Sequence, residues 1–357
     1  LSFVRLKEPV ELQFANNLCN ISFGLEKRKA NRFDAIIGFL PNQGADNGLR
    51  ITGYADLHLD NLFHSGKSLT FQWQQFQALS QTLRLNYNHP NLLRSPIGID
   101  FEANLIRQDT TFLNTNLAFD IFYVRNKVEL AFLTNIISSR QLSNPVDTTS
   151  LPSVADYNMN LFGVDFKYGD IDYQPNPRAG FSLEAGIKFG NKKINKNPNL
   201  PEAIYDSLEL NSGQLQVNLA SEINYGIGKL FSLNANLQAG AIWNNDRLFV
   251  NDLLRLGGVN TLRGFNELEL FVSGYGLLRL EWRLLMSEAS RILIFYDQAF
   301  TANSIMKNTD APLGFGAGIN LQTAGGDLQL VYGLGVSQEQ SLSLDQSKIH
   351  LGYVATF

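Results

Sequence analysis

The sequence has little of several features that commonly reveal a function. It has one cysteine, Cys19, among 357 residues, so no disulfide can form within the chain and no cysteine-based metal site is supported. No apolar run approaches the length of about 18 residues that a transmembrane helix needs. The net charge of −4 gives no basic footprint for nucleic acid. The sequence has four histidines, His58, His64, His89 and His350, and they show no spacing typical of a metal site or a Ser/His/acid triad. We therefore expect no enzyme, no metal and no cofactor.

What the sequence does have is a pattern of period two, which indicates β-strands with one apolar face. It begins near Arg32 and is clearest from Phe231 to Trp243, where apolar residues alternate with Ser232, Asn234 and other polar residues. We count about sixteen such segments. The segment at 155–169 alternates poorly, and we interpret it as a strand mainly because its neighbours need one.

The connections and the chain end favour a membrane barrel over a soluble sandwich, although both architectures alternate. Many segments run ten or more residues, which fits a bilayer span of about 9–11 residues. Short links alternate with long ones, as in outer-membrane barrels. The chain ends on Phe357, with apolar residues at every second position back to Ile349. We therefore predict an all-β fold, a transmembrane antiparallel β-barrel of about 16 strands over residues 31–357.

Residues 1–30 are the least readable part of the sequence. Val10–Phe14 and Ile21–Phe23 look like strands. We interpret residues 1–30 as a lead-in segment, either the end of a periplasmic domain or a connection into the barrel. Because the sequence starts at Leu1 without a signal peptide, we expect a mature or trimmed form that further protein once preceded.

One loop, near residues 244–272, is far longer than a hairpin requires, and structureless loops of that length are usually functional. It carries Leu256-Gly-Gly258 and then Leu262-Arg-Gly-Phe265. We predict that this loop folds into the barrel lumen.

These motifs resemble the BamA/TamA superfamily of outer-membrane assembly and two-partner-secretion proteins. A hydrophobic-Arg-Gly-Phe/Tyr motif on a long loop is typical of that family. Phe295-Tyr-Asp-Gln-Ala299 is similar to its aromatic-x-Asp-x-Gly motif, with Ala299 in place of the glycine. The glycine-rich stretch 314–332 resembles its last hairpin, with Gly326-Asp327 where Gly-Pro is more common. The resemblance implies a sixteen-stranded barrel, with periplasmic POTRA domains as usual companions; residues 1–30 would be the end of one.

The loop motif also has a physical interpretation of its own. A partly desolvated Arg263 needs anionic partners, and alternation places Asp297 and Glu281 on the polar face of their strands. Gly264 would allow a close approach or a positive φ, and Phe265 would wedge against the wall. The alternative is that Arg263 is a solvated loop arginine.

Barrel closure requires that the first strand, Phe33–Leu40, pairs with the last, Ile349–Phe357. Glycine weakens or kinks a strand. Gly352 therefore suggests an imperfect seam that could receive a client strand by β-augmentation. The alternative is that Gly352 merely packs in the lumen. The residues predicted at this seam, or lateral gate, are Phe33, Ala35, Ile37, Gly352 and Tyr353. Tyr353 and Phe357 are the expected C-terminal assembly signal.

Together these features predict an outer-membrane protein of a Gram-negative bacterium that inserts or translocates other proteins. The alternatives are a two-partner-secretion exporter of unfolded protein and a passive pore. The expected partners are unfolded outer-membrane or secreted clients, outer-membrane lipids, and periplasmic or lipoprotein accessory subunits, with no nucleic acid. The basic run of Lys192, Lys193 and Lys196 is interpreted as a solvated external loop.

Overall fold

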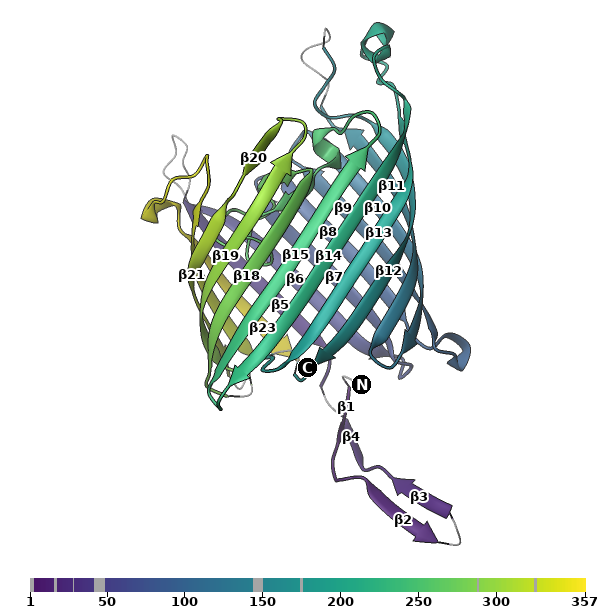
Figure 1. The fold of residues 1–357 in the computed structure, drawn as a ribbon, viewed down its shortest axis with the longest axis vertical. Coiled ribbons are helices and arrows are strands. Elements are labelled where there is room, and N and C mark those ends of the chain that lie inside the picture. The colour runs from purple at the N-terminus through teal and green to yellow at the C-terminus, as the bar shows by residue number, and fades with distance from the viewer. Residues whose placement is uncertain are drawn as a thin grey trace.

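Most of the chain forms one closed antiparallel β-barrel, drawn in Figure 1. The structure is a computed structural model that describes residues 3–15, 18–27, 29–41, 49–143, 150–173, 176–287, 289–323 and 326–357. The barrel strands are β5 (Arg32–Pro41), β6 (Leu49–Leu62), β7 (Lys67–Gln77), β8 (Ser80–His89), β9 (Ile97–Gln108), β10 (Phe112–Arg125), β11 (Val128–Gln141), β12 (Tyr157–Ile171), β13 (Gly180–Ile194), β14 (Asn211–Ile227), β15 (Phe231–Asn244), β18 (Gly274–Leu285), β19 (Arg291–Asn303), β20 (Asn308–Asp310), β21 (Leu313–Gln322), β22 (Asp327–Val336) and β23 (Lys348–Thr356).

The barrel has sixteen strands, because β20 and β21 are two parts of one strand. Both pair with β19, and only Ala311 and Pro312 separate them. Proline has no N–H to give to a ladder, which accounts for the break. The predicted fold class and strand number are confirmed.

The strand pairing is antiparallel around the barrel, with register shifts only in the β6–β7 and β7–β8 ladders of the described residues. Between β12 and β13, for example, the register runs without a shift from Tyr157↔Ile194 to Ile171↔Gly180. The poorly alternating segment is therefore a full strand, β12. Its inward-facing Tyr157, Met159 and Leu161 are apolar and buried. Their hydropathy therefore does not distinguish the inward face of this strand from its outward face.

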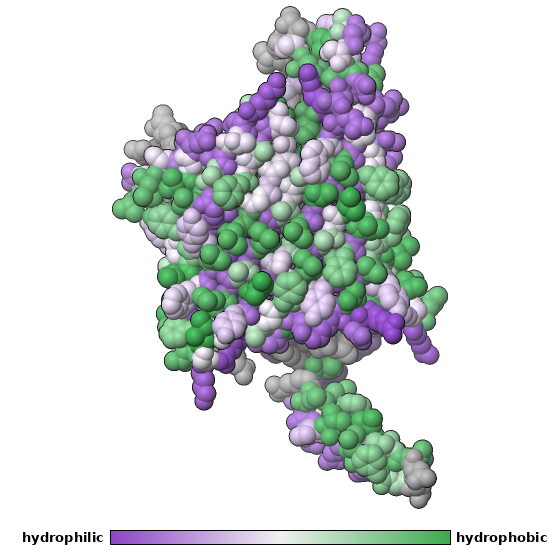
Figure 2. Space-filling model, in the orientation of Figure 1, coloured by the Kyte–Doolittle hydropathy of each residue, from purple (hydrophilic) through white to green (hydrophobic). Residues whose placement is uncertain are grey.

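The outer wall is apolar across the middle of the barrel, and hydrophilic atoms gather at its upper end (Figure 2). Outward-facing side chains such as Phe132, Phe162 and Val164 are about half exposed and have no protein layer over them. An exposed apolar band with a polar interior is the arrangement of a transmembrane barrel. Within the described residues, no helix has the length and the apolar character needed to cross a membrane.

Short turns lie at the end of the barrel that carries both termini, and the long connections lie at the other end (Figure 1). We call these the periplasmic and external ends. The short segments of the external end are the 3-10 turns η2 (Glu202–Tyr205), η3 (Val250–Asp252) and η4 (Leu344–Gln346), whereas η1 (Leu92–Arg94) lies at the periplasmic end. Ala324 and Gly325, in the predicted last-hairpin turn, lie outside the described residues.

The lead-in segment forms two small ladders below the barrel rather than joining its wall (Figure 1). Strand β1 (Val4–Leu6) pairs with β4 (Leu25–Lys27), and β2 (Glu11–Ala15) pairs with β3 (Leu18–Ser22). Phe14, Leu18 and Ile21 of the β2–β3 hairpin are exposed, and so is Cys19.

Candidate functional site

The long loop between β15 and β18 turns inward and lies against the inner wall. It contains η3 and a short ladder of β16 (Leu254–Leu256) with β17 (Leu270–Val272), and the tip at 257–269 carries the Arg-Gly-Phe motif. Gly257 and Gly258 have φ of +116° and +98°, values that favour glycine. A Cβ at Gly257 would lie 2.2 Å from the carbonyl oxygen of Asn266. The Gly-Gly pair is therefore needed to fold the tip back on itself.

Arg263 is buried and bound by two carboxylates on the barrel wall. Its Nε donates to Oδ2 of Asp297 at 2.7 Å, and its Nη2 donates to Oδ1 at 2.6 Å, a bidentate pair. Nη1 donates to Oε1 of Glu281 at 2.6 Å, and the guanidinium carbon lies 3.8 Å from the centre of the Phe295 ring. The structure therefore brings together the three charged residues named from the sequence.

Burial alone would lower the pKa of Arg263, but the hydrogen bonds and charges of Asp297 and Glu281 outweigh it and raise that pKa above its usual value. The guanidinium is thus charged at every physiological pH. Removing one partner of such a buried pair typically costs about 3–5 kcal/mol, because it leaves an uncompensated buried charge.

Two further arginines, which the sequence did not single out, complete this cluster. Arg279 donates from Nη1 to the carbonyl oxygen of Asn260 at 2.8 Å and from Nη2 to that of Val259 at 3.1 Å. Arg283 donates from Nε to Oε2 of Glu281 at 2.7 Å. Arg279 therefore holds the backbone of the loop tip, and Arg283 orients the carboxylate that binds Arg263.

Glycines on both sides allow the loop to touch the wall backbone to backbone. Gly264 has φ of +91°, and a Cβ there would lie 2.4 Å from the carbonyl of Leu334. On the wall, a Cβ at Gly314 would lie 1.8 Å from the carbonyl oxygen of Arg263, and one at Gly335 would lie 2.5 Å from that of Gly264. The glycine-rich β21–β22 hairpin is thus the surface on which the motif rests.

Phe265 fills an apolar pocket beside the ion pairs. It packs with Leu262, Leu277 and Ala299, and all four are almost completely buried. Ala299 stands where the related motif has glycine, and its methyl group is part of this cluster. The substitution therefore suits the packing around Phe265.

The loop is also attached to a second region of the wall through Asn251. The Asn251 side chain donates to Oγ of Ser139 at 2.5 Å and to the carbonyl oxygen of Ala155 at 2.7 Å. Its own carbonyl oxygen accepts from Nδ2 of Asn114 at 2.8 Å and from the hydroxyl of Tyr157 at 3.1 Å. These contacts fix η3 to strands β10 to β12 and to the adjoining loop.

Asp252, which follows Asn251 in η3, forms an ion pair with Lys192 of β13, and both side chains are fully buried. The ammonium also lies 4.8 Å from the centre of the Tyr157 ring and 4.9 Å from that of Phe249. The expectation that Lys192 is solvated was wrong, because the loop covers it. Its neighbour Lys193 points outward and is exposed.

A third attachment uses an arginine among aromatic rings. The guanidinium of Arg255 lies 4.5 Å from the centre of the Phe271 ring, 5.4 Å from Phe112 and 5.7 Å from Phe76, and its Nη1 donates to Oε1 of Gln108 at 2.7 Å. Burial lowers the pKa of Arg255 to about 10. Cation–π contacts and one amide therefore hold the loop against β7, β9 and β10.

The seam between β23 and β5 is closed over eight residue pairs, from Ile349↔Phe39 to Thr356↔Arg32. Tyr353 lies opposite Ala35, and Gly352 lies opposite Ile36. A Cβ at Gly352 would lie 3.3 Å from Cγ1 of Ile36, so this glycine packs closely and the strand is not kinked there.

The other predicted seam and chain-end residues face outward. Phe33, Ile37 and Tyr353 are exposed on the outer wall, and so is the side chain of Phe357. The backbone N–H of Phe357 donates to the carbonyl oxygen of Asn31 at 3.0 Å, which ties the chain end to the start of β5.

Solved structures with a similar fold include barrels of BamA and CdiB. One is BamA from Haemophilus ducreyi lacking POTRA domains 1–3, with 12% identity, a TM-score of 0.60, and coverage of 98% of this chain and 75% of that chain. CdiB from Acinetobacter baumannii matches with 12% identity and a TM-score of 0.64, over 100% of this chain and 66% of that one. CdiB from Escherichia coli matches with 14% identity and a TM-score of 0.63, over 98% of this chain and 68% of that one.

At these identities the likeness establishes the fold: the chain has the barrel fold of BamA and CdiB, as the resemblance of its motifs implied. The chain spans about two thirds to three quarters of the length of those structures. No protein-family model matches the sequence, and no curated protein sequence matches it.

Proposed function

We propose that this chain is an outer-membrane assembly factor that inserts polypeptide clients into the membrane of a Gram-negative bacterium. The observation that carries this proposal is the Arg263 cluster, in which a buried loop arginine binds Asp297 and Glu281 against a glycine-lined wall. The resemblance of the loop motif to outer-membrane assembly and secretion proteins supports the same function.

The loop argues against a passive pore. A pore requires an open lumen, whereas this loop reaches two walls and is held by ion pairs at both, Arg263–Asp297 and Asp252–Lys192. Burying such charges carries a large desolvation penalty. We therefore favour a role for this loop beyond the passive conduction of solutes.

The proposed entry point for a client is the seam between β23 and β5. The ladders on both sides of β23 are short, with eight residue pairs to β5 and seven to β22 against fifteen between β12 and β13, so little pairing holds the last strand on either side. An opened seam exposes backbone N–H and C=O groups on β5 and β23, which a client strand can extend by β-augmentation. Phe33, Ala35, Ile37, Gly352 and Tyr353 would then line this lateral gate.

A second candidate is an exporter of unfolded secreted protein through the lumen. The wall from β6 to β9 favours it, because amides and carboxylates there bond to one another and present a polar surface. Nδ2 of Asn86 and of Asn88 donates to the carboxylate of Asp100, at 2.5 and 3.0 Å, and Nε of Arg84 donates to Glu102 at 2.9 Å. An extended polypeptide could exchange hydrogen bonds with such a wall.

In either case the partners are unfolded protein clients and the lipids of the outer membrane, with periplasmic or lipoprotein accessory subunits at the end that carries the termini. We assign no catalytic role and no cofactor. Tyr353 and Phe357 would serve the assembly of this barrel itself, because outer-membrane barrels typically end on such an aromatic signal.

Depletion of the protein in its native host, followed by quantification of every outer-membrane protein, tests the proposal. A broad fall across β-barrel proteins is the expected result. Loss of one secreted product or a small set, with other barrels intact, would favour the exporter. Unchanged amounts of all outer-membrane and secreted proteins would contradict both the assembly factor and the exporter and would favour the passive pore.

A further inference from the structure

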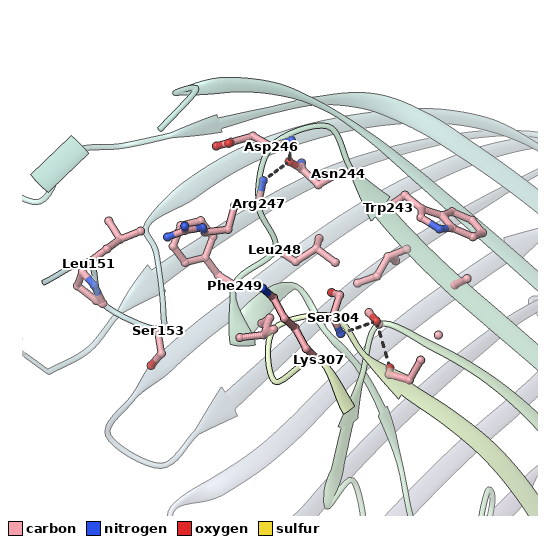
Figure 3. A pocket seen from close by; sticks show the side chains of 17 residues that line it. Leu151, Ser153, Trp243, Asn244, Asp246, Arg247, Leu248, Phe249, Ser304 and Lys307 are labelled. Atoms are coloured by element: carbon pink, nitrogen blue, oxygen red, sulfur yellow. Dashed lines mark hydrogen bonds between the residues drawn. The ribbon is translucent and has the colours of Figure 1, made fainter. Parts of the chain in front are cut away.

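A cavity of about 770 Å³ opens at the external rim of the barrel, away from the Arg263 cluster. Four segments enclose it: residues 151–153 before β12, residues 241–249 at the end of β15, residues 273–274 at the start of β18, and residues 302–307 at the tip of the β19–β20 hairpin. Figure 3 shows Arg247, Phe249, Ser304 and Lys307 around this cavity, with Trp243 at its side.

Two exposed cations line the cavity. Within the part of the chain that the structure describes, neither Arg247 nor Lys307 takes part in an ion pair. The carboxylate in the lining is Asp246, and its Oδ2 accepts from the backbone N–H of Glu209 at 3.1 Å. The lining therefore offers positive charge to an anion.

Both cations sit on segments whose backbone is held in place. The N–H of Arg247 donates to Oδ1 of Asn244 at 3.0 Å. At the hairpin tip before Lys307, the N–H groups of Ile305 and Met306 donate to Oδ1 of Asn303 at 3.0 and 3.1 Å. A preorganised site loses less entropy when a ligand binds.

On the lipid-facing side the cavity continues into a hollow in the wall. Ala241, Gly274 and Ala302 lie side by side in register across β15, β18 and β19. One step below, a Cβ added at Gly276 would meet no atom within 4 Å. Trp243, half exposed on the same face, is an aromatic residue of the kind found at membrane interfaces.

We propose that this cavity binds the phosphorylated headgroup of a glycolipid in the outer leaflet, with an acyl chain lying in the hollow. Arg247 would bind a phosphate through two parallel N–H donors and Lys307 through its point charge. The hollow over Gly274 supplies apolar contact directly below the headgroup. The inference rests on the membrane location of the barrel but not on its action on polypeptides.

The test uses the purified full chain, folded in an uncharged detergent, with native mass spectrometry as the readout. The probe is lipid A carrying both phosphates, titrated beside the same lipid without phosphates and inorganic phosphate alone. The double variant R247Q/K307Q should bind phosphorylated lipid A at least about tenfold more weakly than the unaltered protein. A matched control, R140Q/K193Q, removes two exposed cations at the external end outside the cavity and should stay within about twofold.

Each other outcome overturns the proposal. Equal weakening in both double variants would mean that binding follows net charge and not this cavity. Equal affinity for the phosphate-free lipid would remove the role of the cations. Equal affinity for inorganic phosphate alone would identify a bare anion site without a lipid. Migration of the folded species on an unheated gel verifies that both double variants are folded before titration.

Discussion

Arg263 joins the tip of the lumenal loop to strands β18 and β19. Its guanidinium makes three short hydrogen bonds to Asp297 and Glu281, and the Asp297 side chain is fully buried. An unpartnered carboxylate at such a site is strongly unfavourable, whereas an exposed ion pair contributes little. Removing an arginine should therefore destabilise the protein far more at the buried Arg263 pair than at an exposed ion pair of the lumen.

Replacing Arg263 with alanine should lower the stability of the docked loop by about 3–5 kcal/mol. Limited proteolysis at the loop and the temperature at which the folded band is lost on a gel would measure this. Arg84→Ala is the matched control, because Arg84 pairs with Glu102 at a half-exposed site and should cost less than about 1 kcal/mol. Equal effects of the two variants would mean that the Arg263 cluster does not hold the loop.

Gly264 should not tolerate a side chain. Gly264→Ala adds a Cβ 2.4 Å from the carbonyl of Leu334 at φ +91°, so the loop must move away from β22. We expect loss of about 1–3 kcal/mol from the backbone conformation alone, visible as faster cleavage of the loop by protease. Gly276→Ala, where a Cβ meets open space, should leave cleavage unchanged. Equally slow cleavage of Gly264→Ala and Gly276→Ala would contradict the close approach of Gly264 to the backbone of Leu334.

At the scale of elements, the lumenal loop acts as a brace between two walls. Arg263 attaches its tip to β18 and β19, while Asn251 and Asp252 attach η3 to β10–β13. The two attachments lie in different parts of the loop and share no residue. Each can therefore be removed without directly breaking the other.

Asn251→Ala should loosen the η3 end, which the Asp252–Lys192 pair still holds, while the tip stays docked. The change removes the side-chain bonds to Ser139 and Ala155, which corresponds to about 1–3 kcal/mol when the partners are left unsatisfied. Larger and noisier ion conductance in planar bilayers is the expected result. Asn245→Ala, an exposed neighbour in the same loop, serves as the control and should conduct like the unaltered protein. Quiet, unchanged conductance in Asn251→Ala would show that η3 does not obstruct the lumen.

The period of two was sufficient to predict the strands, because it fixes which side chains share a face. It placed Asp297 and Glu281 on the polar face, but only the resemblance of the motifs at 262–265 and 295–299 to a known family favoured them as partners of Arg263 over a solvated loop arginine. The β12 strand was hard to recognise because Met159 and Leu161 face inward although they are apolar. Arg279, Asn251 and the Lys192–Asp252 pair were not predictable, because they depend on where a distant loop crosses the lumen.

At the scale of the whole molecule, the barrel combines a loop held in its lumen with a last strand that has short ladders on both sides. The loop is fixed to two walls, and the last strand meets the first over eight residue pairs. If clients enter the membrane through this seam, it must open while the rest of the barrel stays paired. A covalent lock across β23 and β5 should then block function without disturbing the fold.

The most direct measurement is outer-membrane protein content in cells whose only copy of this protein carries Ala35→Cys and Tyr353→Cys. These residues face each other in the register, where opposite Cβ atoms are about 4.5–5.5 Å apart. Cys19→Ser removes the native thiol. A lock between interior strands, Phe162→Cys with Phe189→Cys, is the control. We predict that the seam lock depletes β-barrel proteins until a reductant restores them and that the control has no effect; normal protein content with the seam fully cross-linked would contradict the lateral gate.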